Sequence, residues 1–211
     1  MILNYIKILL KCKYTFLPPK KSEVVIFDEH SIQIISKIFN LKKIKVLRTR
    51  KEEINLFILF KNFIKLKFGF NEYLTSFIIF TKAKVIITSI DNNKNFYNLV
   101  SSCKAITIFF QNGVRMGHKD IFEILNYPKQ LKNFKKNNFV NFMFTFNQMT
   151  SDLYQKIING KTIVCGSILS NSKKISFKKK KGIIYISLFR PNFKKKTHIN
   201  EIKLIQSLGK Y

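Results

Sequence analysis

The sequence predicts an α/β fold in which helices cover both faces of a parallel sheet. Short segments such as 84–89 (KVIITS) are apolar and rich in β-branched residues, which is typical of strands buried on both faces. Segments with apolar residues at helical spacing alternate with these strands, the order expected of βαβ units. Several strands end in polar turns, where open sheets of this Rossmann-like kind bind their ligands.

The composition is that of a folded chain with a large basic excess. The 211 residues are 46% hydrophobic, and the formal net charge is +28. Of the 39 basic residues only four are arginines, Arg48, Arg50, Arg115 and Arg190, and the other 35 are lysines. Phosphate and nucleic-acid sites favour arginine, whereas lysine with abundant Asn, Ile and Phe also results from AT-rich codons. The charge is therefore either compositional or the mark of an anionic partner such as acidic lipid headgroups. We expect no specific nucleic-acid site.

The three cysteines predict neither a disulfide framework nor a metal site. Cys12, Cys103 and Cys165 are scattered and show no metal-ligand spacing. They are typical of small apolar residues in a reducing cytoplasm. We therefore expect a cytoplasmic protein without cofactor or metal, with the inner face of the cytoplasmic membrane as the alternative location.

The first segment, Met1–Phe16, is apolar but interrupted by lysines. It is too short and too charged to span a bilayer, and it lacks a small-residue cleavage site. Two interpretations remain: a first helix packed on the domain, or an amphipathic helix lying on an anionic membrane surface.

Strands and helices then alternate up to the central unit of the chain. The expected elements are a strand at Glu23–Phe27, a helix from Asp28 to about Phe39, a strand at Ile44–Leu47, an amphipathic helix at Glu52–Lys67 and a helix at Tyr73–Phe80. The cluster Asp28-Glu29-His30 at the first strand exit has two interpretations. It provides acid–base chemistry, or Asp28 or Ser31 caps the following helix.

The central unit is a strand at Lys84–Ser89, a helix at Asn95–Val100 and a strand at Ala105–Phe110. Parallel strands joined by a helix have both exits on one edge of the sheet. This edge therefore combines two polar turns, which contain Asp91, Asn92 and Asn93 after the first strand, and Gln111, Asn112, Gly113 and Arg115 after the second.

The remaining sequence predicts further α/β units and a second domain. We expect a helix at Asp120–Leu125, a loop at Tyr127–Asn138, a strand at Phe139–Phe146, a helix at Gln148–Ile158 stopped by Asn159-Gly160, and a strand at Lys161–Cys165. Residues 170–181 form a basic linker between a domain at 1–169 and residues 182–211. There a strand at Gly182–Leu188 and a helix at Thr197–Leu208 cannot bury a core alone, so they are expected to begin an incomplete second α/β domain.

Four short motifs, in this order and spacing, resemble a bacterial family of surface carbohydrate biosynthesis proteins. They are Ile90-Asp91-Asn92-Asn93 with Phe96-Tyr97, Gln111-Asn112-Gly113-Val114-Arg115, Gly166-Ser167 with Asn171, and Tyr185–Pro191. The resemblance implies a glycosyltransferase of two-domain GT-B architecture acting in lipopolysaccharide or other surface polysaccharide synthesis. It also implies that the N-terminal domain handles a saccharide or lipid-linked acceptor, and that a missing C-terminal domain grips the sugar nucleotide. We accordingly expect a fragment that is inactive alone.

The chemistry of individual residues agrees with this resemblance in part. Asp91 is the best-placed carboxylate to deprotonate an acceptor hydroxyl, and His118 is the alternative base. The backbone at Asn112-Gly113 and the cation of Arg115 suit phosphate or an oxyanion, and Arg190 either reaches donor phosphates or pairs at a domain interface. The bland alternatives are a helix cap at Asp91, an ordinary Asn-Gly turn and a surface His118. A more distant similarity is to glycerophosphate and polysaccharide polymerases, which have a His-Gly pair where this chain has Asn112-Gly113. Because asparagine replaces that histidine here, the chain lacks the catalytic base that this comparison would imply.

A second function class also remains open at this stage. A basic α/β domain without activity of its own can act as a binding module for anionic membrane or nucleic acid. A degenerate, inactive product is the third possibility.

Overall fold

A computed structural model describes residues 12–36, 44–50, 52–113 and 120–168, together with residues 203, 206 and 207. The chain divides into two compact units, Met1–Lys173 and Lys174–Tyr211, and the architecture below is that of the first. The predicted linker and the predicted strand at Gly182–Leu188 lie outside the described residues, as does nearly all of Thr197–Leu208. The predicted division into domains stays a prediction.

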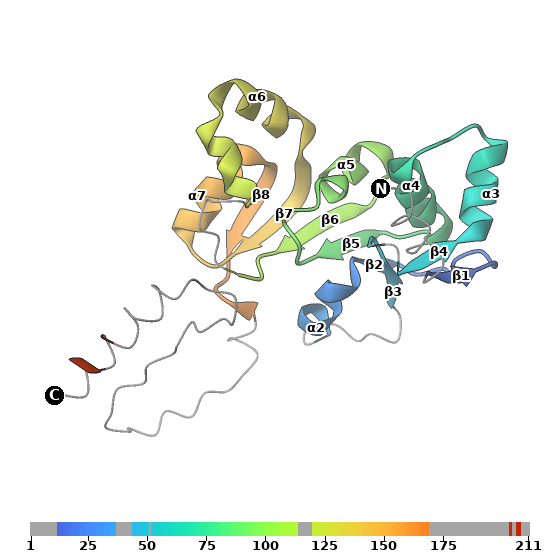
Figure 1. Ribbon diagram of the computed structural model, residues 1–211, viewed down its shortest axis with the longest axis horizontal. Coiled ribbons are helices and arrows are strands. Elements are labelled where there is room, and N and C mark those ends of the chain that lie inside the picture. The colour runs from blue at the N-terminus through green and yellow to red at the C-terminus, as the bar shows by residue number, and fades with distance from the viewer. Residues whose placement is uncertain are drawn as a thin grey trace. The chain divides into compact units, whose positions relative to one another are not determined.

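The first unit is built on a six-stranded sheet in which every neighbouring pair of strands is parallel (Figure 1). Its order is β3-β2-β5-β6-β7-β8. The strands are β2 Val24–Phe27, β3 Ile44–Leu47, β5 Val85–Thr88, β6 Ile106–Phe110, β7 Phe139–Thr145 and β8 Asn159–Val164. The predicted α/β class is confirmed, and each of these strands overlaps a predicted one.

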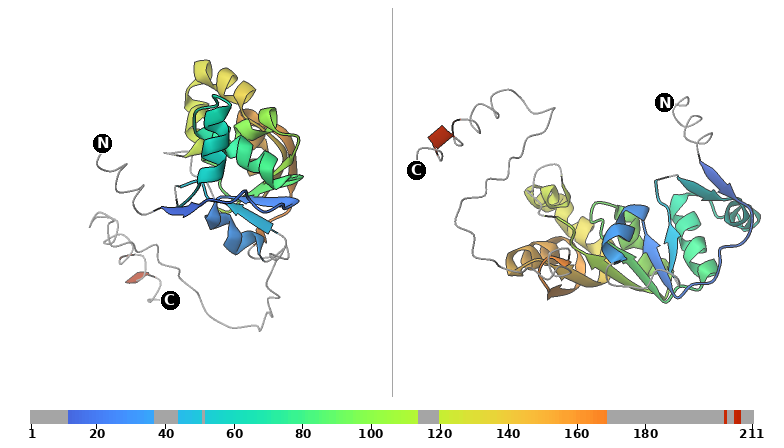
Figure 2. Two further views of the ribbon diagram at one scale, coloured as in Figure 1. Left: turned by 90° about the vertical axis from the view of Figure 1, so that its right-hand side faces the viewer. Right: turned by 90° about the horizontal axis from the view of Figure 1, so that it is seen from below.

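The helices lie on both faces of the sheet, as predicted. They are α2 Ile32–Ile35, α3 Leu56–Ile64, α4 Phe70–Thr81, α5 Lys94–Ser102, α6 Pro128–Asn137 and α7 Gln148–Ile157, with 3-10 turns η1 Glu29–Ser31 and η3 Ile121–Asn126. From β2 the chain adds β3 on one side of the sheet, and it then adds β5, β6, β7 and β8 in turn on the other side. Since such crossovers are right-handed, α2 covers the face opposite α4, α5 and α7 (Figure 2). None of the described helices is long and apolar enough to cross a membrane.

The core is divided by the two faces of the sheet. Along β2, Val25 and Phe27 point into a large cluster with α4, α5 and α7, whereas Ile26 points into a smaller cluster with Ile35 of α2. This alternation follows from the two-residue period of a strand. All four side chains are fully buried, which explains the unbroken apolar sequence of the strand.

Two helix predictions near the N-terminus are wrong in part. Lys13–Thr15 is not helical but forms strand β1, parallel to β4 at Glu53–Asn55; residues 1–11 lie outside the described residues. The helix expected from Glu52 therefore begins only at Leu56. The side chain of Asn55 contributes to both the start of α3 and the pairing of β1 with β4. Its Oδ1 caps the helix by accepting from the Ile58 N–H at 3.0 Å, and its Nδ2 holds β1 by donating to the Thr15 hydroxyl at 3.0 Å.

Two later predictions are also corrected. The expected loop at Tyr127–Asn138 is helix α6, because Pro128 occupies the first turn, where proline is compatible with a helix. Asn159-Gly160 does not simply stop α7 but opens β8. Gly160 has φ +148° and lies against the Val140 carbonyl, leaving no room for a side chain.

Candidate functional site

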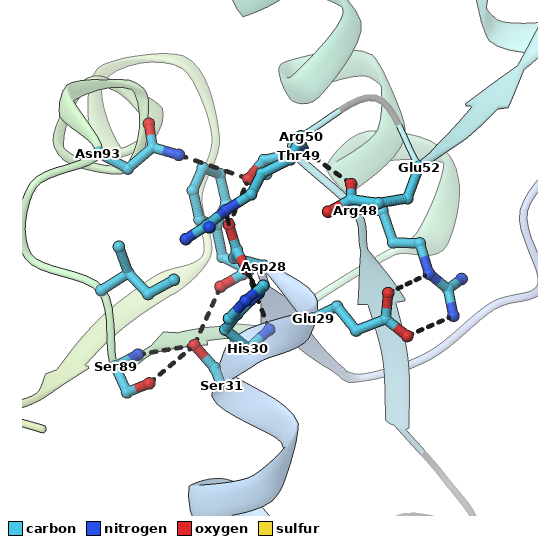
Figure 3. A network of polar contacts seen from close by, with 12 residues as sticks. Asp28, Glu29, His30, Ser31, Arg48, Thr49, Arg50, Glu52, Ser89 and Asn93 are labelled. Atoms are coloured by element: carbon cyan, nitrogen blue, oxygen red, sulfur yellow. Dashed lines mark hydrogen bonds and ion pairs between the residues drawn. The ribbon is translucent and has the colours of Figure 1, made fainter. Parts of the chain in front are cut away.

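The candidate site lies at the carboxyl edge of the sheet, where the strand order reverses between β2 and β5. Open α/β sheets bind ligands at such a switch point. Three strand exits meet there: 28–31 after β2, 48–50 after β3 and 89–93 after β5 (Figure 3).

Asp28 is the buried hub of this site. Its Oδ1 accepts from the His30 backbone N–H at 3.0 Å, and its Oδ2 accepts from Thr49 Oγ1 at 2.9 Å and Arg50 Nε at 3.0 Å. Burial raises the pKa of Asp28, but these hydrogen bonds and the charge of Arg50 outweigh it, so the pKa lies below its ordinary value. The residue holds φ at 77°, an unusual conformation for a non-glycine residue. Asp28 is therefore an ionised anchor, and the predicted helix cap is confirmed.

Arg50 is fixed at one nitrogen only. Nε is bonded to Asp28, whereas the two terminal nitrogens have no hydrogen-bond partner within the part of the chain that is described. The side chain is 51% exposed and lines a shallow pocket of about 460 Å³ together with Asp28, Ile90, Asn92, Asn93, Lys94 and Asn95. A guanidinium held in this way presents a preoriented fork of donors to an anion.

Arg48, two residues earlier, is fully engaged with protein groups. Its Nε and one terminal nitrogen bond both oxygens of Glu29 at 2.9 and 3.1 Å, and the other terminal nitrogen bonds Glu53 at 2.6 Å. The Arg48 hydrogen bond lowers the pKa of Glu29. Arg48 thus ties the β2 exit to β4 with a protein partner at each of its three side-chain nitrogens, whereas the side chain of Arg50 has a partner among the described residues only at Nε.

The β2 and β5 exits are joined by a pair of serines. Ser31 Oγ accepts from the backbone N–H of Ser89 at 2.9 Å and lies 3.0 Å from the Ser89 hydroxyl. Both residues are buried. This contact holds the first turn after β2 against the start of the β5 exit and so fixes the two strand exits relative to each other.

His30 contributes an imidazole at the rim of the site. Its Nδ1 lies 3.3 Å from Asp28 Oδ1, and 64% of its side chain is exposed. A carboxylate beside one ring nitrogen orients the imidazole and leaves the other nitrogen for proton transfer. No group of three or more metal-binding side chains occurs among the residues whose positions are described.

Asp91 is not the open, solvent-facing carboxylate that a catalytic base at this edge would be. It is buried, and its Oδ2 accepts from the Tyr154 hydroxyl at 2.6 Å. The Tyr97 hydroxyl donates to the Asp91 carbonyl at 2.7 Å. These bonds attach α5 and α7 to the β5 exit, and they leave the catalytic role of Asp91 a prediction.

The structure brings the two predicted polar turns to one edge, but they differ in construction. Asn93 caps α5 and donates to Thr49, and Asn92 beside it is exposed in the pocket. Gln111 is buried: its Nε2 donates to the Gly113 carbonyl at 3.0 Å and its Oε1 accepts from the Phe146 N–H at 2.8 Å. Gln111 thus shapes the β6 exit, while Asn112 and Gly113 are exposed at it.

The other predicted site residues lie after β8 or outside the described residues. Gly166 follows β8 with φ +76°, and Ser167 next to it is half-buried. Arg115, His118 and Arg190 are outside the described residues. Their predicted roles stay predictions.

Sequence reasoning missed Thr49 and Arg50 as site residues. Their signal was present: two of the four arginines of this lysine-rich chain, Arg48 and Arg50, follow a predicted strand directly. The meeting of that strand exit with Asp28 depends on the pairing of β3 with β2, which local sequence does not show.

Comparison with known proteins agrees with the resemblance at the level of the biological process. Residues 108–206 match a family model described as "putative O-antigen biosynthesis protein". This match supports a surface carbohydrate biosynthesis family. It includes the motifs at Gln111–Arg115, Gly166-Ser167 and Tyr185–Pro191, whereas the switch-point residues precede it. Searches of curated proteins and of solved structures returned no match.

Proposed function

We propose that the chain is a cytoplasmic, glycosyltransferase-like protein of cell-surface polysaccharide biosynthesis that binds a phosphate-bearing acceptor at the switch point. Two findings support this: the O-antigen family match and the polar switch point of a doubly wound sheet. The observation that carries the proposal is Arg50, whose anchored guanidinium has two terminal nitrogens directed to no protein group of the described chain.

The anion would bind between Arg50 and the start of α5. Asn92 and Asn93 supply amide groups there, and the first backbone N–H groups of α5 add a partial positive charge. Arg50 would donate two hydrogen bonds to one phosphate group, as a guanidinium does to planar or tetrahedral anions. Acceptors of surface polysaccharides that are linked to lipid diphosphate carry such a group, so we propose this acceptor class.

In a GT-B arrangement the acceptor hydroxyl attacks the anomeric carbon of a sugar nucleotide, and the nucleoside diphosphate leaves. The hydroxyl proton needs a base on the acceptor side. His30 fits this role because Asp28 orients its Nδ1 and leaves Nε2 for the proton. Asp91 remains the alternative, but it would first have to exchange its bond from Tyr154 for one from the acceptor.

Binding of a short-chain prenyl-diphosphate saccharide, measured by calorimetry, tests the proposal. We expect the Arg50→Ala protein to bind at least about tenfold more weakly. Lys129→Ala, which removes an exposed cation from α6, is the matched control and should bind like the wild type. The same saccharide without diphosphate should bind equally weakly to all three proteins. Unchanged affinity in Arg50→Ala contradicts the proposed acceptor site.

We also propose that the chain needs the missing sugar-nucleotide domain for activity, so a transfer assay with that domain supplied addresses the base. His30→Gln should lower the rate of transfer by about 100-fold or more while leaving acceptor affinity within about twofold. If Asp91→Asn lowers the rate of transfer and His30→Gln does not, the general base is Asp91 and not His30.

A further inference from the structure

Helix α3 and the turn that follows it expose an unusual number of large apolar side chains. Figure 1 shows α3 at one end of the described unit, beside α4. Every residue from 63 to 71 is exposed. We define the α3 patch by its exposed apolar members, Leu59, Phe60, Phe63, Ile64, Leu66, Phe68 and Phe70.

The patch is the apolar face that the sequence predicts for this helix. α3 is attached to the domain along a narrow line, where Ile58 is buried and Asn62 Oδ1 accepts from the Ser76 hydroxyl at 2.6 Å. The opposite side of the helix therefore carries Phe60 and Phe63 into solvent, 61% and 65% exposed. The fold does not use these rings to bury its core.

The turn after α3 places a leucine where the backbone disfavours one. Leu66 has φ 54°, in the left-handed region, and is 78% exposed. The left-handed conformation raises the free energy of a leucine by about 1 kcal/mol. Glycine or asparagine would adopt it at a lower cost. Phe63 and Phe68 pack edge to face at the base of this turn, with ring centroids 6.1 Å apart. The turn thus combines an exposed leucine with a pair of exposed aromatic rings.

Composition alone does not explain the patch. Helix α6 lies on the surface of the same chain and has no buried residue, yet its exposed positions after Pro128 are lysine, asparagine and glutamine. Its two apolar side chains, Leu131 and Phe134, pack against the core. Large exposed apolar surfaces on a protein mark an interaction site.

The charges around the patch identify the kind of partner. Lys61, Lys65 and Lys67 alternate with its apolar residues, and Glu72 is the one acidic residue in the sequence between Glu53 and Asp91. Lys67 is 3.4 Å from Glu72, while Lys65 is exposed. Apolar and aromatic side chains interleaved with lysines match a surface with acidic headgroups above hydrocarbon. A second copy of this chain would bring two strongly basic molecules together.

We propose that the α3 patch docks the protein on an anionic lipid bilayer, with the rings of Phe60, Phe63 and Phe68 in the interface and the lysines at the headgroups. This inference does not depend on the glycosyltransferase proposal.

The absence of tryptophan in the sequence permits a clean test. Phe63→Trp gives a single fluorophore in the patch, and Tyr127→Trp gives one at an exposed position outside it. With vesicles of phosphatidylglycerol and phosphatidylcholine we expect a blue shift and quenching by brominated lipid for Phe63→Trp only. Phosphatidylcholine vesicles alone should produce neither. Equal responses of the two tryptophans, or none, overturn the proposal.

Vesicle flotation then measures how matched sets of substitutions change binding of the chain to lipid. Phe60→Ser combined with Phe63→Ser should weaken binding by more than about tenfold. Lys65→Glu with Lys67→Glu should weaken it by at least about fivefold per lysine on anionic vesicles. The control, Lys129→Glu with Lys132→Glu on α6, should lose much less. Concentration-dependent self-association that the serine variant abolishes, without vesicle binding by the wild type, would assign the patch to a second copy and overturn the proposal.

Discussion

Replacing Asp28 by asparagine tests how far the switch point depends on one buried carboxylate. Its Oδ2 accepts from Thr49 and Arg50, and its Oδ1 accepts from the His30 N–H. Asparagine in the same orientation keeps an acceptor for His30 but turns an NH2 donor toward the other two donors. The substitution preserves size and removes both the charge and two hydrogen bonds.

The expected loss of stability follows from these contacts. A hydrogen bond to a charged group contributes about 1.5–3 kcal/mol, and two such bonds are broken. The Thr49 hydroxyl can rotate to accept instead, and Arg50, which is half-exposed, can turn to water. We therefore expect a net decrease of about 2 kcal/mol in the free energy of unfolding at neutral pH. With a urea slope of about 2 kcal/mol/M, the unfolding midpoint should fall by about 1 M.

The pH dependence gives an independent check with a definite sign. The folded-state pKa of Asp28 is lowered, so its stabilisation is complete above the unfolded value of about 3.9 and is lost as the pH falls through the folded pKa. The wild-type protein should therefore approach the stability of Asp28→Asn below pH 4. Parallel pH profiles for the two proteins would show that Asp28 is not the ionised anchor described here.

The assay is urea unfolding followed by circular dichroism, with Asp152→Asn as control. Asp152 is an exposed carboxylate on α7 that accepts from Gln148 Nε2 at 2.7 Å, so its loss should cost less than about 0.5 kcal/mol. Equal midpoints for wild type and Asp28→Asn at neutral pH would refute the reasoning. A large decrease in stability for Asp152→Asn would show that the loss of any negative charge destabilises this basic protein, whatever its position.

Three further predictions concern the supports of the site and the sheet. Tyr154→Phe should lower the free energy of unfolding by about 2 kcal/mol, because it removes a donor from the buried carboxylate of Asp91; unchanged urea unfolding contradicts this. Gly160→Ala should cost more than about 2 kcal/mol and speed amide exchange in β8, since the added methyl group meets the Val140 carbonyl; normal protection in β8 would exclude that clash. Burial raises the pKa of Cys103, so its alkylation rate, followed by mass spectrometry, should rise at higher pH than that of a free thiol.

The strands of this protein and their polar exits could be predicted from sequence. A run such as Val85–Thr88 is short and β-branched throughout, and its residues suit a strand that is covered on both faces. The alternation with helices then determines a parallel sheet, and parallel strands place the turns at Asp91 and Gln111 on one edge. These are local signals, which is why they were correct.

The predictions that were wrong concern segments whose local signals conflict. Pro128 in a stretch rich in lysine and asparagine favours a loop, but proline in the first turn and the packing of Leu131 and Phe134 make it helical. At Gly160, glycine serves a close approach to β7 that becomes visible only once the two strands are paired.

The sequence by itself predicted an amphipathic helix before Gly69 and a carboxylate at a strand exit, Asp91, and it contains an arginine, Arg50, just after another predicted strand. Only the tertiary structure decided what each of them faces. The line of attachment through Ile58 turns the apolar side of α3 outward, the hydroxyl of Tyr154 closes over Asp91, and Asp28 orients Arg50 toward the pocket. The physical reason is that residue type and spacing determine which element forms, whereas exposure and charge environment depend on contacts between elements distant in sequence.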